Sequence, residues 1–495
     1  VRVVYFSSDK MQGNAYSDFD PAQWDPSQAP VVKPDGTLVT NAAGQPLTKA
    51  GSIANQLNGV VLAGKGLVPP GVFTTSPHLA PRVGFAWDIF GDGKTSLRGG
   101  YGVGYGRIPF AIYAGNLSNT PFESVTNLLN GSLSNPGLGA PGALTTQSIG
   151  TVGPPNKKYD PVQIQTWSVT IQRQLLQNGV LSLAYVGSHS NNIPGVLDRN
   201  FPLPVSGPSI ADPGCLQSGQ GIPAGGFEFD PCLNRSLVSR SYTRPFTGWD
   251  AINGQANSAA QYNGVTNYHS LQAGFNYHLS SALTLSLAYT FGRSLTDVAS
   301  RGFDARQTGN GAQNPRNFGA EYGRPGYDRT HIFTSSYVWN LPIFRNRTGF
   351  VGVVLGNWTF SGMTIIESGF VFSPGMATST NGLATRPNCI GRVRTPKTVS
   401  QWFDQSSFTA PAFGFFGTCG NGIIPGPGEN TWNWSLYKTF PITERVKLEF
   451  RSEFFNVWNH ANFTAVSTNL GAGDFGEVTA ALDPRQIELA LKLTF

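Results

Sequence analysis

The four cysteines are the residues whose chemistry is most constrained by their spacing. They form two pairs, Cys215 with Cys232 and Cys389 with Cys419, and each pair lies within one polar stretch rich in glycine and proline. Zinc sites usually show Cys-x-x-Cys or Cys/His spacings, and the sequence has none. Free thiols in such exposed stretches would be reactive. The pattern therefore predicts two disulfides, Cys215–Cys232 and Cys389–Cys419, formed in an oxidising compartment.

The other groups with catalytic potential form no recognisable reactive centre. The six histidines lack the His-x-x-x-His and His-Glu-x-x-His spacings of metal sites, and no Gly-x-Ser-x-Gly motif occurs. Glu449 and Glu453 alternate with Lys447 and Arg451, which is typical of a mutually neutralising row of charges on a wet surface. We therefore expect no enzymatic activity, no metal site and no cofactor.

A glycine-rich run at residues 99–106 fits neither the dinucleotide-binding fingerprint nor the phosphate-binding P-loop, and no helix pattern follows it. With a period of two, the glycines share one face of a strand and Tyr101, Val103 and Tyr105 share the other. The glycine face consists of Gly100, Gly102, Gly104 and Gly106. We interpret it as a glycine-lined lumen wall that another body can approach closely. A strand bent sharply by glycine explains the run equally well.

Loop side chains could contact an anionic or aromatic ligand, because loops on rigid scaffolds often bind. For any single one of them, an ordinary solvated surface side chain is the better explanation. The candidates are Arg240, Arg244, Trp249, Arg301, Arg306, Arg316 and Arg324.

The elements that must position these residues are alternating strands. In the last ten residues Ile487, Leu489, Leu491, Leu493 and Phe495 alternate with polar or small neighbours, which predicts a strand with one apolar face. Residues 446–454 behave alike, and their row of charged positions cannot face a dry core. About twelve such strands are expected, at residues 1–6, 79–90, 95–107, 162–175, 180–189, 270–279, 283–292, 330–341, 358–367, 431–440, 446–454 and 486–495.

The connections between these strands alternate between short and long. Tight turns are expected at residues 91–93, 177–179, 280–281 and 443–444. Long loops are expected near residues 7–78, 108–160, 190–262, 296–329, 368–430 and 459–484. This pattern is typical of an antiparallel transmembrane outer-membrane β-barrel with short periplasmic turns and long extracellular loops. We therefore expect residues 1–495 to form one all-β barrel domain, because only helices and closed sheets satisfy the backbone inside hydrocarbon.

Composition excludes several other classes of protein. Hydrophobic residues make up 40% of the chain, too many for a disordered polypeptide, and no stretch approaches the roughly 18 apolar residues of a spanning helix. The net charge of +6 is small and the basic residues are scattered, so no nucleic-acid partner is expected. A soluble β-sandwich would have shorter loops.

Several stretches resemble the Oar-like TonB-dependent receptors. The similarity lies in Leu79–Asp88 and the following Phe90–Thr95 and Leu97–Gly102, in Ala184–His189, in Glu453–Phe463, and in the terminal strand that ends on Phe495. The resemblance implies a 22-stranded barrel that encloses an N-terminal plug and imports a ligand with energy delivered through the TonB complex. It also implies that Leu491, Leu493 and Phe495 are the signal read by the barrel-assembly machinery.

The chain departs from this family pattern at its start. We expect the plug and the TonB box to be missing before Val1, and about twelve strands to make up the C-terminal half or so of such a barrel. We therefore expect a fragment whose N-terminal plug and strands are missing, located in the outer membrane of a Gram-negative-type bacterium and taking part in uptake of an unidentified ligand. A passive porin or a surface adhesion barrel is the alternative, and a secreted soluble β-protein is a weaker one.

Overall fold

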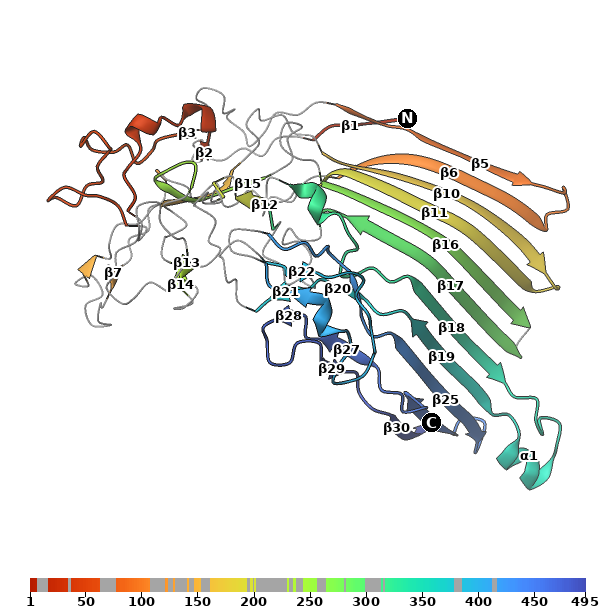
Figure 1. Ribbon diagram of the computed structural model, residues 1–495. Helices are drawn as coiled ribbons and strands as arrows, with labels where there is room; N and C mark the ends of the chain where they lie inside the picture. Colours follow the sequence, from red (N-terminus) through yellow and green to blue (C-terminus); the bar gives the residue numbers. More distant parts are fainter. Residues whose placement is uncertain are drawn as a thin grey trace.

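The structure, a computed structural model, is dominated by one large antiparallel β-sheet (Figure 1). It describes residues 1–6, 17–33, 37–62, 77–106, 121–122, 128–129, 140–141, 147–152, 161–193, 196–198, 200–201, 229–230, 235–236, 244–255, 264–279, 282–298, 313–314, 317–377, 385–411 and 416–495. Each strand of the large sheet pairs with its neighbours in chain order. The strands are β5 (Arg82–Asp88), β6 (Thr95–Gly106), β10 (Val162–Leu175), β11 (Gly179–Ile193), β16 (Gly264–Leu279), β17 (Leu283–Thr296), β18 (His331–Asn340), β19 (Thr359–Glu367), β25 (Glu429–Pro441), β26 (Lys447–Phe455) and β30 (Gln486–Thr494).

The predicted all-β fold is confirmed, with a difference in the strand count. The large sheet has eleven strands rather than twelve, because the first predicted strand is short and pairs elsewhere. Within the expected strand at residues 1–6, the structure has β1 (Arg2–Val4), which pairs antiparallel with β4 (His78–Ala80). Only Pro81 separates β4 from β5, and proline interrupts a hydrogen-bonded ladder because it lacks a backbone N–H.

The large sheet is open. In the part of the chain that the structure describes, β5 and β30 do not pair with each other and form its two edges. Figure 1 shows β5 and β30 at opposite ends of the curved sheet. Unpaired backbone N–H and C=O groups are costly in hydrocarbon, so an edge inside a membrane needs a further strand.

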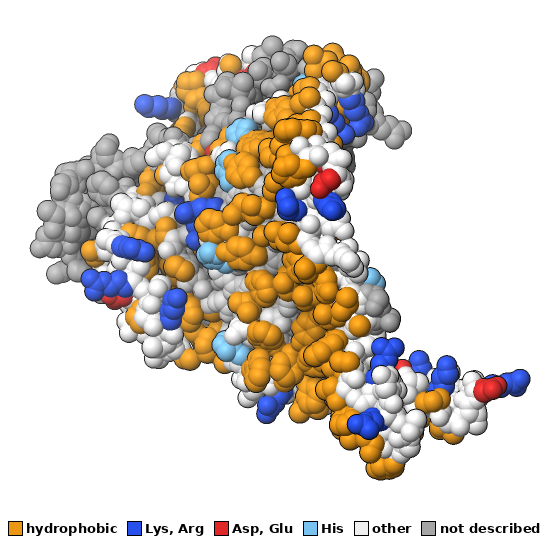
Figure 2. Space-filling model, turned by 90° about the vertical axis from the view of Figure 1, so that its right-hand side faces the viewer, with side chains coloured by type: hydrophobic (Ala, Val, Ile, Leu, Met, Phe, Trp, Pro, Cys, Tyr) orange, Lys and Arg blue, Asp and Glu red, His pale blue; other side chains and the backbone are white. Residues whose placement is uncertain are grey.

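The register gives the sheet two chemically different faces. Residues directly opposite each other in antiparallel strands share a face, so the pairing extends the alternation of each strand across the whole sheet. Val83 lies opposite Tyr101, Tyr101 opposite Trp167, and at the other edge Phe450 lies opposite Leu491. We call this side the apolar face. Figure 2 shows a broad band of hydrophobic side chains on the sheet.

The opposite side, the polar face, carries small and charged residues. Gly100 lies opposite Ser168, Ser286 lies opposite Ser336, and Glu449 lies opposite Lys492.

On the apolar face Val83 is 69% exposed and Leu491 is 70% exposed. Such large exposed apolar side chains in a continuous row are the surface expected of a lipid-facing sheet.

Glycines on the apolar face accommodate aromatic rings from the next strand. A Cβ atom built at Gly99 would overlap the ring of Phe85, and one built at Gly187 would overlap the indole of Trp167. Each glycine lies directly opposite its aromatic partner. The ring covers the bare backbone, as in aromatic rescue of strand glycines.

The short connections lie at one end of the sheet and the long ones at the other (Figure 1). The 91–93 turn is a tight one, with positive φ angles of 71° at both Gly91 and Gly93. Its Gly93 N–H donates to the carboxylate of Asp88 over 2.8 Å. The connection between β18 and β19 contains α1 (Gly349–Leu355), which alternation did not predict. In the part of the chain that the structure describes, no helix is long and apolar enough to cross a membrane.

Short strands occupy the long loops and the segments beside them. Apart from β1 and β4 they are β2 (Ser17–Phe19), β3 (Val60–Leu62), β7 (Leu128–Leu129), β8 (Ala140–Pro141), β9 (Gln147–Val152), β12 (Val196–Asp198), β13 (Phe229–Asp230), β14 (Arg235–Ser236), β15 (Trp249–Gln255), β20 (Val371–Phe372), β21 (Gly375–Met376), β22 (Asn388–Cys389), β23 (Phe408–Thr409), β24 (Ile424–Pro425), β27 (Phe463–Val466), β28 (Asn469–Leu470) and β29 (Val478–Ala481). The loops therefore contain ordered structure of their own.

Among the described residues, two hydrophobic clusters each join parts of two long loops. The larger cluster joins the 368–430 and 459–484 loops and consists of Trp402, Phe403, Phe408, Cys419, Ile424, Val466 and Phe475. In it the ring of Phe403 meets those of Phe408 and Phe475 edge to face, at centroid distances of 5.4 and 5.1 Å. The smaller cluster joins the 7–78 and 190–262 loops through Phe19 and Trp249.

Candidate functional site: the polar wall and the outer loops

The charged row predicted on residues 447–453 lies on the polar face of β26. Arg451 contacts the carboxylate of Glu449 at 2.9 Å and that of Glu453 at 3.6 Å. All three side chains are partly exposed, and Lys492 of β30 lies opposite Glu449. The row therefore neutralises itself on a wet surface, and such exposed pairs add little stability.

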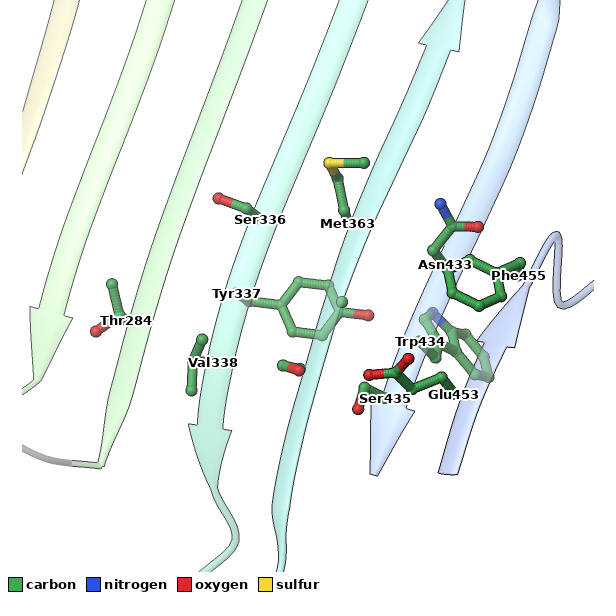
Figure 3. Close-up of a pocket in the computed structure, with 12 residues that line it drawn as sticks. Thr284, Ser336, Tyr337, Val338, Met363, Asn433, Trp434, Ser435, Glu453 and Phe455 are labelled. Atoms are coloured by element: carbon green, nitrogen blue, oxygen red, sulfur yellow. The ribbon is translucent and has the colours of Figure 1, made fainter. Parts of the chain in front are cut away.

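A hollow of about 340 Å³ opens where β17, β18, β19, β25 and β26 meet (Figure 3). Three of the residues that line it are apolar although they lie on the polar face. They are Val338, Met363 and Phe455, which are 44%, 46% and 38% exposed. The other residues that line it are Thr284, Ser336, Tyr337, Ser361, Gly362, Asn433, Trp434, Ser435 and Glu453. The hollow thus combines exposed apolar side chains with hydroxyls, an amide and a carboxylate. Such a surface is better suited to binding another molecule than to catalysing a reaction.

Sequence reasoning missed this hollow because it treated the polar positions as uniformly wet. The signal was present in single strands, where Val338 and Met363 stand at positions that alternation assigns to the polar face. Only the register of five strands shows that these positions lie together.

The glycine run of β6 gives a second open part of the polar face. Gly100, Gly102 and Gly104 line a hollow of about 510 Å³ together with residues such as Arg82 and Thr166. A Cβ atom at any of these three glycines would meet nothing closer than 3.5 Å, and one at Gly106 would first meet Val162 at 3.8 Å. The described part of this chain therefore does not require glycine there for close packing. If glycine is required at these positions for packing, the requirement would come from another protein segment or molecule that packs against the polar face of β6.

The long outer loops are joined by a buried ion pair. Arg386, in the 368–430 loop, donates two hydrogen bonds to the carboxylate of Glu321, in the 296–329 loop, at 2.7 and 2.9 Å. The two side chains are 7% and 1% exposed. Asn421 accepts a hydrogen bond from Arg386, and Gln313 donates its backbone N–H to Glu321. This network joins the described parts of the two loops at the cost of desolvating both charges.

A disulfide joins Cys389 and Cys419 in the same region, with Cα atoms 4.9 Å apart. Cys419 belongs to the larger hydrophobic cluster. The other predicted pair, Cys215 and Cys232, lies outside the described residues. In the part of the chain that is described, no group of three His, Cys, Asp or Glu side chains could hold a metal ion.

Three of the loop residues proposed as ligand contacts have partners within the chain. Trp249 is 3% exposed in the smaller cluster and donates its indole N–H to the Asn58 carbonyl. Arg324 pairs with Asp328 at 2.6 Å, and Arg244 donates to the Asn200 carbonyl. Arg240, Arg301, Arg306 and Arg316 lie outside the described residues.

Short capped turns contribute the local electrostatics of the loops. Asp404 caps a 3₁₀ turn at Gln405–Ser407 by accepting hydrogen bonds from the hydroxyl and the backbone N–H of Ser406. These hydrogen bonds, the hydroxyl bond first, lower the pKa of the Asp404 carboxyl. Ser27 has the same effect on the pKa of Asp25. Both carboxylates therefore serve turn structure.

The terminal strand presents its predicted residues on the apolar face at the free edge. Leu491 lies opposite Phe450 and Leu493 opposite Leu448, while Leu493 and Phe495 are 54% and 93% exposed. This position leaves them accessible. Recognition of these residues by the assembly machinery stays a prediction.

Comparison with known proteins agrees with this geometry. The family model described as outer membrane beta barrel domain matches residues 1–488. Among curated protein sequences, none matches the chain.

Solved structures of outer-membrane transporters are similar to the chain at low identity. The transporter YddB from Escherichia coli is 12% identical with a TM-score of 0.44, and the match covers 85% of this chain and 41% of that one. The ferric citrate transporter FecA is 10% identical with a TM-score of 0.37, covering 86% and 39%. The ferripyoverdine receptor of Pseudomonas aeruginosa is 10% identical with a TM-score of 0.36, covering 87% and 34%. The chain thus spans less than half the length of each.

Proposed function

The chain belongs to the outer membrane β-barrel domain family, and from this premise we propose that it forms the C-terminal part of the wall of a TonB-dependent receptor that takes up a ligand. The protein is located in the outer membrane of a Gram-negative-type bacterium. The observation that carries the proposal is the pair of faces on an open sheet, one apolar and one lined by charges, glycines and two hollows.

A sheet of this kind needs further strands to close the barrel and a plug domain to occupy its interior. The edges at β5 and β30 leave backbone groups unpaired, which hydrocarbon does not tolerate. The exposed Val338, Met363 and Phe455 on the polar face would be covered by a plug inside the closed barrel. We propose that strands and a plug from the rest of the receptor supply both, and that the plug connects the barrel to the TonB complex.

The proposal places ligand capture at the outer loops. The Arg386–Glu321 pair joins described parts of the 296–329 and 368–430 loops, and the Cys389–Cys419 bridge closes a segment within the second loop. A preorganised loop surface lowers the ordering cost of binding. The similarity of residues 79–102 to Oar-like receptors supports the assignment to a TonB-dependent receptor.

The experiment that tests this function uses the protein expressed from its native gene. Formaldehyde crosslinking in energised cells, followed by purification of the protein, should recover TonB, and planar bilayers containing the purified protein should show no steady conductance. Steady single-channel conductance without a TonB crosslink would identify a passive porin instead.

A further inference from the structure

The apolar face changes character toward the ends of the strands that carry the long loops. Above the aromatic residues Trp167, Tyr185 and Tyr289, the same face presents amides, imidazoles and one guanidinium. These polar residues are Gln163, Gln165, His189, Asn267, His269, Arg293 and His331. Figure 2 shows histidine side chains along one border of the hydrophobic band. The border marks the depth at which this face leaves hydrocarbon.

Two tyrosine–histidine pairs repeat at this border with the same geometry. The hydroxyl of Tyr185 lies 2.7 Å from Nδ1 of His269, and the hydroxyl of Tyr289 lies 2.8 Å from Nδ1 of His331. In each pair the histidine comes two residues before the residue opposite the tyrosine, on the side of the long loops. When the phenol donates to Nδ1, the neutral imidazole carries its proton on Nε2. Both histidines are exposed, so these N–H groups are available as donors.

Arg293 lies between the two histidines on the same face. It is directly opposite His269, and it is diagonal to His331, which lies opposite Phe291. The side chain is exposed and has no hydrogen-bond or ion-pair partner among the residues that the structure describes. Facing residues of opposite strands have Cβ atoms about 5 Å apart, so the three side chains can converge on one group. The nearby Arg329 is engaged by Glu367 and stacks on Phe370.

We propose that His269, Arg293 and His331 bind the phosphate of an anionic glycolipid in the outer leaflet. Arginine pairs with phosphate through two parallel hydrogen bonds, and the two imidazoles add donors on either side. Leu271 and Phe291 lie level with His331 and below His269 and Arg293, and Tyr289 lies lower still. These three side chains are 45%, 47% and 36% exposed and supply an apolar surface for the acyl chains of the same molecule. A phosphate above and hydrocarbon below match an amphiphile and not a free anion. The site depends on membrane placement and not on the proposed receptor activity.

The test uses the full chain in detergent micelles and measures binding of diphosphoryl lipid A by native mass spectrometry. Arg293→Gln and His269→Leu should each weaken binding about tenfold, the effect of losing a hydrogen bond to a charged group. Arg293→Lys should retain part of the affinity. The matched control is Arg98→Gln, because Arg98 is an exposed arginine of the same sheet on the polar face and should leave binding unchanged.

A second measurement uses only the wild-type protein and compares two lipids, so the test remains decisive if a variant misfolds. Wild-type protein should bind lipid A without phosphates about tenfold more weakly, and equimolar inorganic phosphate should not displace diphosphoryl lipid A. Equal binding of the two lipids, or equal binding by Arg293→Gln and wild type, would overturn the proposal. Displacement by inorganic phosphate would overturn the choice of a lipid.

Discussion

The indole of Trp167 lies against Gly187 on the neighbouring strand, in the space that a side chain at residue 187 would need. On the opposite face, Gly100 has no such neighbour, since a Cβ atom there would meet only the Val83 carbonyl at 3.6 Å. Gly187 thus has a packing role on the apolar face that Gly100 lacks on the polar face.

Gly187→Ala should displace the Trp167 ring and destabilise the folded sheet by about 1–3 kcal/mol, as overpacking does. The matched substitution Gly100→Ala should change stability by less than about 0.5 kcal/mol, because the site is open. Urea titration in micelles, followed by the electrophoretic mobility shift of the folded form, measures both. Equal losses for the two variants would show that glycine acts through backbone conformation on both faces.

Strand positions were predictable because period-two alternation is a local property. The strand at residues 162–175 was placed with its observed bounds, and eight other expected segments needed only shifted ends. The expected strand at residues 79–90 is divided by Pro81 into β4 and β5. The prediction that residues 1–6 form a strand of the large sheet was wrong. Only β1 forms there, and it pairs with β4, which Pro81 separates from β5. The segment at residues 270–279 was too short by six residues because Gly264–His269 lack alternating apolar side chains.

The candidate site was less predictable than the strands. The charged row of β26 follows from sequence alone, but the hollow at Met363 needs the register of several strands. The Arg386–Glu321 pair joins residues 65 positions apart in different loops, and no local pattern signals such a contact.

The buried ion pair between the loops gives a second prediction. Glu321→Ala should destabilise the loop arrangement by about 3–5 kcal/mol, because it leaves the Arg386 guanidinium buried without its counter-charge. The double variant Glu321→Met with Arg386→Met removes both charges and should recover most of the loss. Limited proteolysis within the 296–329 and 368–430 loops reports the effect, and Glu477→Ala, at an exposed carboxylate, is the control. Unchanged cleavage in Glu321→Ala would mean that the pair does not hold the loops.

The cysteines give a third prediction. Purified, non-reduced protein should show no alkylated thiol by mass spectrometry, with Cys389 linked to Cys419 and Cys215 linked to Cys232. Cys389→Ser should lower the stability of the 368–430 loop by about 2–4 kcal/mol and speed its proteolysis, because the bridge closes a segment with a separation of 30 residues. Alkylation of Cys215 and Cys232 without reduction would rule out their bridge.

The free edge of the sheet allows a direct comparison of neighbouring residues. Leu489→Arg places a charge on the apolar face and should cost about 2–4 kcal/mol if the site is near the bilayer midplane. Glu488→Arg should be mild, since residue 488 lies on the polar face opposite Glu453, where the new charge meets an opposite one. Folding yield into lipid vesicles measures the difference, and similar yields for the two variants would contradict the assigned faces.

The most direct measurement of which face meets lipid is spin labelling at Leu491→Cys and Lys492→Cys, with accessibility determined by power saturation in lipid bilayers. The label at 491 should be reached by dissolved oxygen and protected from a water-soluble nickel complex, and the label at 492 should show the reverse. Access of the nickel complex to 491 together with protection at 492 would contradict the placement of the apolar face against acyl chains.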